Sequence, residues 1–295
     1  MPVSVSAFVA TRNEEPNIGA ALECLQWADE IWVVDSHSTD RTVQIAAERG
    51  AKVVQFDYPG HGPKKMNWAL DNLPFRNDWV LFIDADERVT VPLQKEIAEA
   101  ITTDHADGFY IDVEYVFMGR ALRCKRPNWN LRLFKHRVGR FERLASNVPH
   151  TGHIEVHEQL LLTERTSHLR SLLVHQDKRS LRAWIDNHNR YSEWETDVYR
   201  AFRREPVAMR GVLSKESVWR KRALKRVWVR LPFRSLGRFL LFYVARRGFL
   251  DGRQGFIYSV LMGWYEFLVS AKLYEARVSS MPGSAMASET SVNVG

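Results

Sequence analysis

Two carboxylates separated by one residue follow an apolar run in the first third of the chain. Asp84 and Asp86 lie in the segment Asp84-Ala85-Asp86-Glu87, directly after the run 79–83. Carboxylate oxygens are hard ligands of the kind that Mg²⁺ or Mn²⁺ prefers, and such an ion can also reach a diphosphate. The alternative is that the pair only ends a strand and caps the next helix.

Three other polar groups also follow apolar runs. Residues 11–15 read Thr-Arg-Asn-Glu-Glu, residues 35–40 read Asp-Ser-His-Ser-Thr-Asp, and residues 60–67 contain Lys64 and Lys65. An ionised Asp35 can accept hydrogen bonds from a base or a ribose, or it can simply start a turn. The two lysines could hold phosphate oxygens, or they could be solvated surface residues.

The elements that must position these groups are short strands alternating with helices. Apolar runs at 3–10, 31–34, 53–56 and 79–83 predict strands, and helical patterns predict helices over 16–27, 39–49 and 63–72. This alternation indicates an α/β fold with a mostly parallel, Rossmann-like sheet covered on both faces. In such sheets ligands bind beyond the carboxyl ends of the strands, where all four polar groups are expected.

The rest of the chain is predicted to be less regular. Residues 87–100 carry a helical pattern, 108–175 mix short strands with loops, and a helix is predicted over 180–203. We expect a catalytic domain over 1–205, a basic amphipathic helical segment over 206–278 and a disordered tail over 279–295. There is no Gly-x-Gly-x-x-Gly after the first strand and no Walker A loop, which disfavours a dinucleotide dehydrogenase or a P-loop NTPase.

In the order of these motifs the chain resembles the family 2 inverting glycosyltransferases of the GT-A fold. It is most similar to the branch that contains lipopolysaccharide-core β-glucosyltransferases. The segments that carry the resemblance are 11–15, Trp27-Ala28-Asp29-Glu30-Ile31, Val33-Val34-Asp35-Ser36, Lys65-x-Asn67-x-Ala69-Leu70 and Asp84-Ala85-Asp86-Glu87-Arg88. The likeness is dense over 3–100 and continues more loosely to about residue 275, through Val156-His157-Glu158 and Gly248-Phe249-Leu250-Asp251-Gly252.

The resemblance implies a nucleotide-sugar site with a divalent metal, Mg²⁺ or Mn²⁺. It implies that Thr11, Arg12 and Glu14 line the nucleotide pocket, that Asp35 holds the uracil or ribose, and that Lys65 lies near the base or the phosphates. Asp84 would bind the ribose or the metal, and Asp86 would be the direct metal ligand.

The family's general base is a carboxylate on the acceptor side, and Glu158 is the candidate here. A single displacement with inversion requires the acceptor hydroxyl to lose its proton as it attacks, which a carboxylate within hydrogen-bond reach can accept. Many relatives have an acidic pair at this point, whereas this chain has His157 before Glu158, so Glu155 and His157 stay as competitors. His175 follows an apolar run and is either a third metal-site residue or a structural histidine.

The last third of the chain is basic. The 295-residue chain has a formal net charge of +7, and thirteen Lys or Arg lie between residues 209 and 255, opposed only by Glu216 and Asp251. The segments 236–250 and 256–273 are apolar and aromatic but interrupted by charges, which favours helices lying in an anionic membrane interface over spanning helices. The alternative is a helical subdomain with a solvated basic face. Without a nucleic-acid motif, no nucleic-acid partner is predicted.

Taken together, these features predict a peripheral enzyme on the cytoplasmic face of the inner membrane. Only two cysteines and no signal-peptide pattern are present, which agrees with a reducing compartment. The expected reaction is transfer of a hexose, with glucose from UDP-glucose as the first candidate, onto a membrane-anchored saccharide such as lipopolysaccharide core. The alternatives are a polyprenyl-phosphate-linked acceptor, a nucleotidyltransferase that makes activated sugars, and a non-catalytic membrane-associated scaffold.

Overall fold

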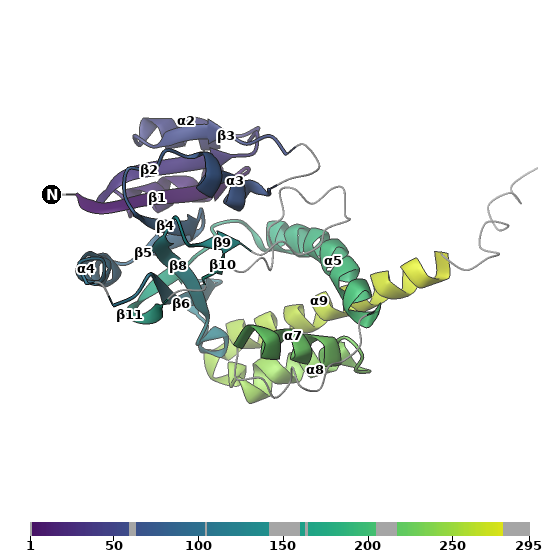
Figure 1. The fold of residues 1–295 in the computed structure, drawn as a ribbon. Coiled ribbons are helices and arrows are strands. Elements are labelled where there is room, and N and C mark those ends of the chain that lie inside the picture. The colour runs from purple at the N-terminus through teal and green to yellow at the C-terminus, as the bar shows by residue number, and fades with distance from the viewer. Residues whose placement is uncertain are drawn as a thin grey trace, which may run out of the picture. The chain divides into compact units, whose positions relative to one another are not determined.

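The computed structural model describes residues 2–58, 63–103, 105–141, 160–162, 165–204 and 217–279. Contacts between residues divide the chain into two units. Figure 1 shows the ribbon with most of its elements labelled. The first unit comprises 1–180 and 246–255, and the second comprises 181–245 and 256–295. The division therefore falls at residue 180, before the boundary at residue 205 that the sequence suggested.

The first unit is built on one mixed sheet, in which the described residues form nine strands. The main path runs in the order β3-β2-β1-β4-β8-β6-β11-β5, and β7 pairs with β6. Their bounds are β1 Val3–Thr11, β2 Ala28–Asp35, β3 Lys52–Gln55, β4 Trp79–Asp84, β5 Glu87–Val89, β6 Gly108–Phe117, β7 Arg120–Ala121, β8 Trp129–Lys135 and β11 Thr166–His175. Strands β3, β2, β1 and β4 are all parallel, as the alternating pattern predicted. A separate pair is formed by β9 Arg140–Phe141 and β10 Leu160–Leu161.

Helices cover both faces of the parallel strands because successive side chains of a strand point to opposite faces. From β1, Val5, Ala7 and Val9 pack in one apolar cluster with residues of three helices, α1 Glu15–Glu23, α2 Thr42–Glu48 and α4 Val91–Ala100. Phe8 points the other way and packs with α3 Lys65–Asn72. All four helices and their approximate positions agree with the sequence patterns.

Two strands differ from the sequence-based expectation. Residues 87–89 were expected to begin a helix. They form β5 instead, which pairs antiparallel with residues 173–175 of β11. Tertiary pairing overrides local helical propensity here, and the helix α4 begins only after Thr90, whose side chain accepts a hydrogen bond from the Leu93 N–H. Strand β8 runs antiparallel between β4 and β6, so the second half of the sheet is not uniformly parallel.

A late segment of the chain returns to the first unit. Its 3₁₀ turn Gly248–Asp251 lies against a second short turn, Arg123–Lys125. The Asp251 carboxylate accepts a hydrogen bond from the Cys124 N–H at 2.9 Å, and Arg246 donates to the Cys124 carbonyl at 3.2 Å. A Cβ on Gly255 would lie 2.0 Å from the Gly248 carbonyl oxygen, so this turn requires glycine there.

The second unit is helical in its described part. It contains α5 Leu181–Arg204, α7 Ser217–Trp228, α8 Arg234–Leu240, a π-helical turn Leu241–Ala245 and most of α9 Gly252–Ser279. None of the helices in the described ranges combines the length and the apolar character needed to span a bilayer.

Buried charges join the helices of this unit. Glu266 is fully buried on α9 and lies 2.8 Å from Arg238 and 3.3 Å from Arg234, both on α8. Glu195 on α5 accepts a hydrogen bond from the Tyr265 hydroxyl at 2.6 Å and pairs with Lys225 of α7 at 3.1 Å. Each carboxylate therefore has a cationic partner on another helix. We call Glu195, Lys225, Arg234, Arg238 and Glu266 the helical ionic network.

Candidate functional site

The parallel strands bring three of the predicted residues to one edge of the sheet. Thr11 pairs with Asp35 across β1 and β2, and Ala10 pairs with Asp84 across β1 and β4. The carboxyl ends of these three strands therefore lie side by side, at the edge where sheets of this kind bind ligands.

Thr11 contacts both Asp35 and Lys65 at this edge. The Thr11 hydroxyl donates to Asp35 at 2.9 Å, and the Lys65 ammonium donates to the Thr11 carbonyl at 2.8 Å. Asp35 is fully buried and also accepts hydrogen bonds from the Ser38 N–H and hydroxyl, so it shapes its own turn. Arg12 is exposed on the loop after β1. The two interpretations of Asp35, ligand contact and turn residue, are therefore compatible.

Asn67, part of the motif in α3, has a structural role. Its side-chain amide donates to the Phe141 carbonyl and accepts from the Phe141 N–H, both at 2.9 Å. It thus ties α3 to β9 and is itself buried.

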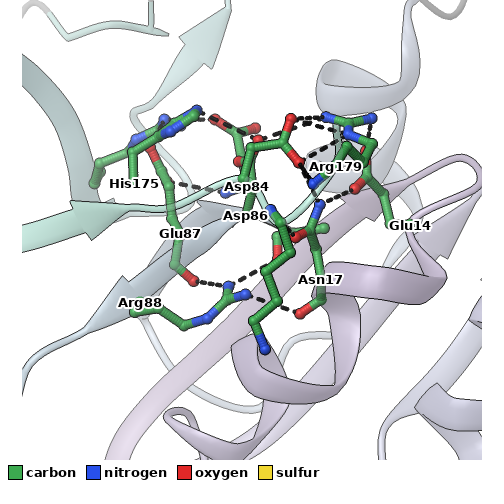
Figure 2. A network of polar contacts seen from close by, with 12 residues as sticks. Glu14, Asn17, Asp84, Asp86, Glu87, Arg88, His175 and Arg179 are labelled. Atoms are coloured by element: carbon green, nitrogen blue, oxygen red, sulfur yellow. Dashed lines mark hydrogen bonds and ion pairs between the residues drawn. The ribbon is translucent and has the colours of Figure 1, made fainter. Parts of the chain in front are cut away.

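Asp86 and His175 form the centre of a second group, which Figure 2 shows from close by. The antiparallel pairing of β5 with β11 places His175 opposite Glu87, and the turn before β5 then brings Asp86 within reach. The Asp86 Oδ2 lies 3.3 Å from the His175 Nε2. Burial raises the pKa of Asp86, which the neighbouring His175 opposes.

These two side chains fit a divalent ion. Neighbouring ligands of an octahedral ion with bonds of about 2.1 Å lie about 3 Å apart, close to the separation between Asp86 and His175. Within the described residues, no group of three or more His, Cys, Asp or Glu side chains is placed to hold a metal. With two protein ligands, the other coordination positions of the ion would be left to water and substrate phosphates.

The His175 ring is held by stacking. It lies on the Tyr115 ring, with centroids 4.5 Å apart and planes inclined by 28°. In turn, the Lys125 ammonium lies 5.1 Å from the centroid of the Tyr115 ring. The buried His175 Nδ1 has no hydrogen-bond partner among the described residues. The direction of Nε2 therefore depends on Tyr115 rather than on a hydrogen bond to the opposite nitrogen.

Asp84 is bound to an arginine that the sequence did not single out. Arg132, in the middle of β8, donates to Asp84 at 2.7 Å and to Glu87 at 2.6 Å. Burial raises the pKa of Glu87 to about 8, with the Arg132 charge acting against the shift. Asp84 thus lies at the end of β4 with Arg132 as its partner, and not in the pair formed by Asp86 and His175.

A second arginine links Glu14 to the same centre. Arg179 lies 3.1 Å from Glu14, 2.8 Å from Asp177 and 3.7 Å from Asp86. Asn17 donates to both Glu14 and Asp177, at 2.9 and 3.0 Å. Burial raises the pKa of Glu14 to about 7, and Arg179 opposes the shift. We call Glu14, Asp84, Asp86, Glu87, Asp177, Arg132, Arg179 and His175 the strand-end cluster.

Some of these residues carried a signal in the sequence and others did not. Glu87 lies within the quoted motif, and Arg179 follows His175 by four residues, so both were visible near predicted residues. Arg132 reads as one of several basic residues in a loop-rich segment and gave no signal. Glu158, Glu155 and His157, the candidates for the general base, lie outside the described residues.

The fold and the cluster define an α/β protein with an acidic site at the carboxyl ends of parallel strands. A family model described as Glycosyl transferase family 2 matches residues 6–160, more than half of the chain. The chain therefore belongs to glycosyltransferase family 2, and the family resemblance indicated by the motifs is confirmed.

Relatives of similar length support this assignment. An uncharacterized glycosyltransferase of Rickettsia typhi is 28% identical over 98% of this chain and 92% of its own length. The lipopolysaccharide core biosynthesis glycosyltransferase LpsC of Rhizobium meliloti is 27% identical over 92% of both chains.

Among solved structures, S. aureus TarS 1–349 aligns over 94% of this chain and 87% of its own, with a TM-score of 0.46 and 21% identity. Glucosyl-3-phosphoglycerate synthase from Mycobacterium tuberculosis, in a complex with Mn²⁺ and UDP, aligns over 39% of this chain and 44% of its own. The TM-score of that alignment is 0.32, at 25% identity. At these scores the assignment rests on the family model and the sequence relatives.

Proposed function

We propose that this family 2 enzyme transfers a hexose, glucose in the first instance, from a UDP-sugar to a membrane-anchored saccharide with inversion at the anomeric carbon. The observation that supports the proposal most directly is the approach of Asp86 to His175 beside the carboxyl ends of β1, β2 and β4. A lipopolysaccharide-core acceptor is suggested by the likeness to LpsC, and a polyprenyl-linked glycan is the alternative. The acceptor would be used at the cytoplasmic face of the membrane.

In this proposal Asp86 and His175 would hold Mg²⁺ or Mn²⁺, which, when bound, neutralises charge on the departing diphosphate. Thr11, Asp35 and Lys65 would bind the nucleoside, because Thr11 contacts the other two at the end of β1, the strand that pairs with β4 just before Asp86. Arg179 places positive charge 3.7 Å from Asp86, and Arg132 does the same at Asp84. These two guanidinium groups would orient the carboxylates before the donor binds.

The donor half of the proposal is tested by calorimetric binding of UDP, GDP and CDP, with and without Mn²⁺. We expect UDP to bind in a metal-dependent manner, and Asp86→Ala to weaken that binding by about a hundredfold or more. Asp78→Ala is the matched control, because Asp78 is an exposed residue at the opposite end of β4. If none of the nucleotides binds under any condition, the proposed reaction is wrong.

The base is tested separately. Glu158→Gln should leave UDP-sugar binding intact while turnover falls by about two to four orders of magnitude. Glu155→Gln serves as the comparison. If Glu158→Gln turns over normally and Glu155→Gln does not, the proton acceptor is Glu155.

A further inference from the structure

The second unit carries the excess positive charge of the chain. Residues 181–245 and 256–295 contain seventeen Lys or Arg and nine Asp or Glu, a formal net charge of +8, compared with +7 for the whole chain. The first unit is therefore close to neutral. The net positive charge of the chain, which attracts an anionic surface at long range, therefore resides in the second unit.

Two helices of this unit expose apolar stripes. On α8 and the π turn the exposed residues recur four apart, and on α9 they recur four and seven apart, so each set lies on one helix face. The six side chains are each 44% to 58% exposed. They are Leu236, Leu240, Val244, Phe256, Val260 and Phe267, and we call them the apolar docking surface.

The two stripes adjoin. Phe239 and Tyr243, which stack on each other, both contact Phe256 edge-on, with centroids 6.2 and 5.5 Å apart. The helices approach closely at Gly263, where a Cβ would lie 3.1 Å from the Ser235 carbonyl oxygen. The Ser235 hydroxyl also donates to the Gly263 carbonyl at 2.7 Å. These three aromatic rings therefore connect α8 and the π turn to α9 beside the exposed stripes.

The charges of these helices are arranged so that the stripes stay apolar. Arg234 and Arg238 of α8 are turned to Glu266 inside the unit. The acidic residues of α8 and α9 are Glu266, which is buried, and Glu275, near the end of α9. Exposed apolar stripes in a unit of charge +8 match a surface that combines anionic head groups with an apolar interior. A second copy of the chain would instead bring two units of +8 together.

We propose that the apolar docking surface inserts into the interface of an anionic phospholipid bilayer, with the basic charge of the second unit adding long-range attraction. This inference goes beyond the transfer reaction and stands without it. It explains how an enzyme whose described helices do not span a membrane could reach a lipid-linked acceptor.

The test is flotation of the full-length protein with vesicles of phosphatidylcholine alone or of equal parts phosphatidylcholine and phosphatidylglycerol. We expect binding to the anionic vesicles, weakened by added salt. Replacing Phe256 and Phe267 together by Ser should weaken this binding by at least about tenfold. Val91→Ser, at an exposed position on α4 of the first unit, is the matched control and should bind like wild type.

Thermal unfolding followed by circular dichroism shows whether the variant is folded, and it separates this test from the proposed reaction because it needs no nucleotide. If the first double variant does not fold, Leu236→Ser with Val244→Ser replaces it. This second double variant should also weaken binding to anionic vesicles by at least about tenfold. Vesicle binding equal to wild type in a folded double variant would overturn the proposal. So would equal binding to both vesicle types, or a wild-type dimer in lipid-free ultracentrifugation that becomes a monomer in the variants.

Discussion

Both units bury carboxylates against arginines, but they balance these charges differently. In the strand-end cluster five carboxylates lie among two arginines and His175, with Arg88 also interacting with Asp86, Glu14 and Glu87. Burial raises the pKa of Glu14 to about 7 and of Glu87 to about 8. In the helical ionic network each carboxylate has its own cation, and Glu266 has two. The first arrangement has a surplus of acidic groups that a divalent ion could relieve. The second is complete by itself and holds helices together.

This contrast predicts the largest effect for a carboxylate of the helical ionic network. Glu266→Gln leaves Arg234 and Arg238 buried beside a neutral amide, so the free energy of unfolding should fall by about 3–5 kcal/mol. Chemical denaturation measures it, and Glu275→Gln on the exposed part of the same helix is the control. A loss below about 1 kcal/mol would show that the network is not a structural element.

A second prediction concerns a buried carboxylate of the first unit that lies at the opposite end of the sheet from the strand-end cluster. If position on the sheet decides the role of such a carboxylate, this one should stabilise the fold without binding a ligand. Glu30 lies near the start of β2, at the end of the strand opposite Asp35. Burial alone would raise the pKa of Glu30, but hydrogen bonds from Lys52 and Ser6 lower it to about 2. Because this pKa is depressed, the stabilising contribution is present above about pH 4.5 and is lost as the pH falls through about 2.

Glu30→Gln should therefore lower the free energy of unfolding by about 2 kcal/mol at neutral pH, with UDP binding unchanged. The difference from wild type should shrink as the pH is lowered toward about 2. Denaturation across this range measures it, with the exposed Glu99→Gln as the control. If Glu30→Gln lost UDP binding but unfolded with the same free energy as wild type, the structural role of Glu30 would be contradicted.

A third prediction concerns the stack that holds His175. Tyr115→Leu removes the aromatic ring on which the imidazole lies, so the Mn²⁺ concentration needed for half-maximal UDP binding should rise about tenfold. Tyr110→Leu is a close control, because Tyr110 lies on the same strand and stacks on His168 in the same way. Equal effects of the two variants would mean that general loosening of β6, not the position of His175, is responsible.

The smallest predicted effect has the opposite sign. Because burial raises the pKa of Glu14 to about 7, its contribution to stability is full below about pH 4.5 and is lost as the pH rises through about 7. In the presence of a chelator, Glu14→Gln should stabilise the protein by about 1 kcal/mol at slightly alkaline pH, with little change near pH 5. Thermal melts measure this difference in stability, with Glu23→Gln at an exposed position as the control. If Glu14→Gln destabilised the protein at alkaline pH, the excess of acidic groups in the strand-end cluster would be contradicted.

The sequence was informative wherever a short-range pattern decides the structure. Apolar runs ending in Thr11, Asp35 and Asp84 predicted β1, β2 and β4, and the parallel arrangement then predicted that these residues meet. The partners of the site residues depend on pairings between distant segments. Arg132 reaches Asp84 only because β8 inserts antiparallel next to β4, and His175 reaches Asp86 only because β5 pairs with β11. Residues 87–89 have no local preference for a strand, so neither contact could be inferred from periodicity.

The return of residues 246–255 to the first unit has a consequence for how the two units can be separated. The chain passes between the units three times, after residues 180, 245 and 255. A gene fragment that stops at residue 180 would remove Asp251 from the Cys124 N–H, which is buried and would lose its hydrogen-bond acceptor. No single cut in the chain separates the two units, because residues 246–255 belong to the first unit and lie between two stretches of the second. The first unit is therefore complete only when residues 246–255 are supplied with it.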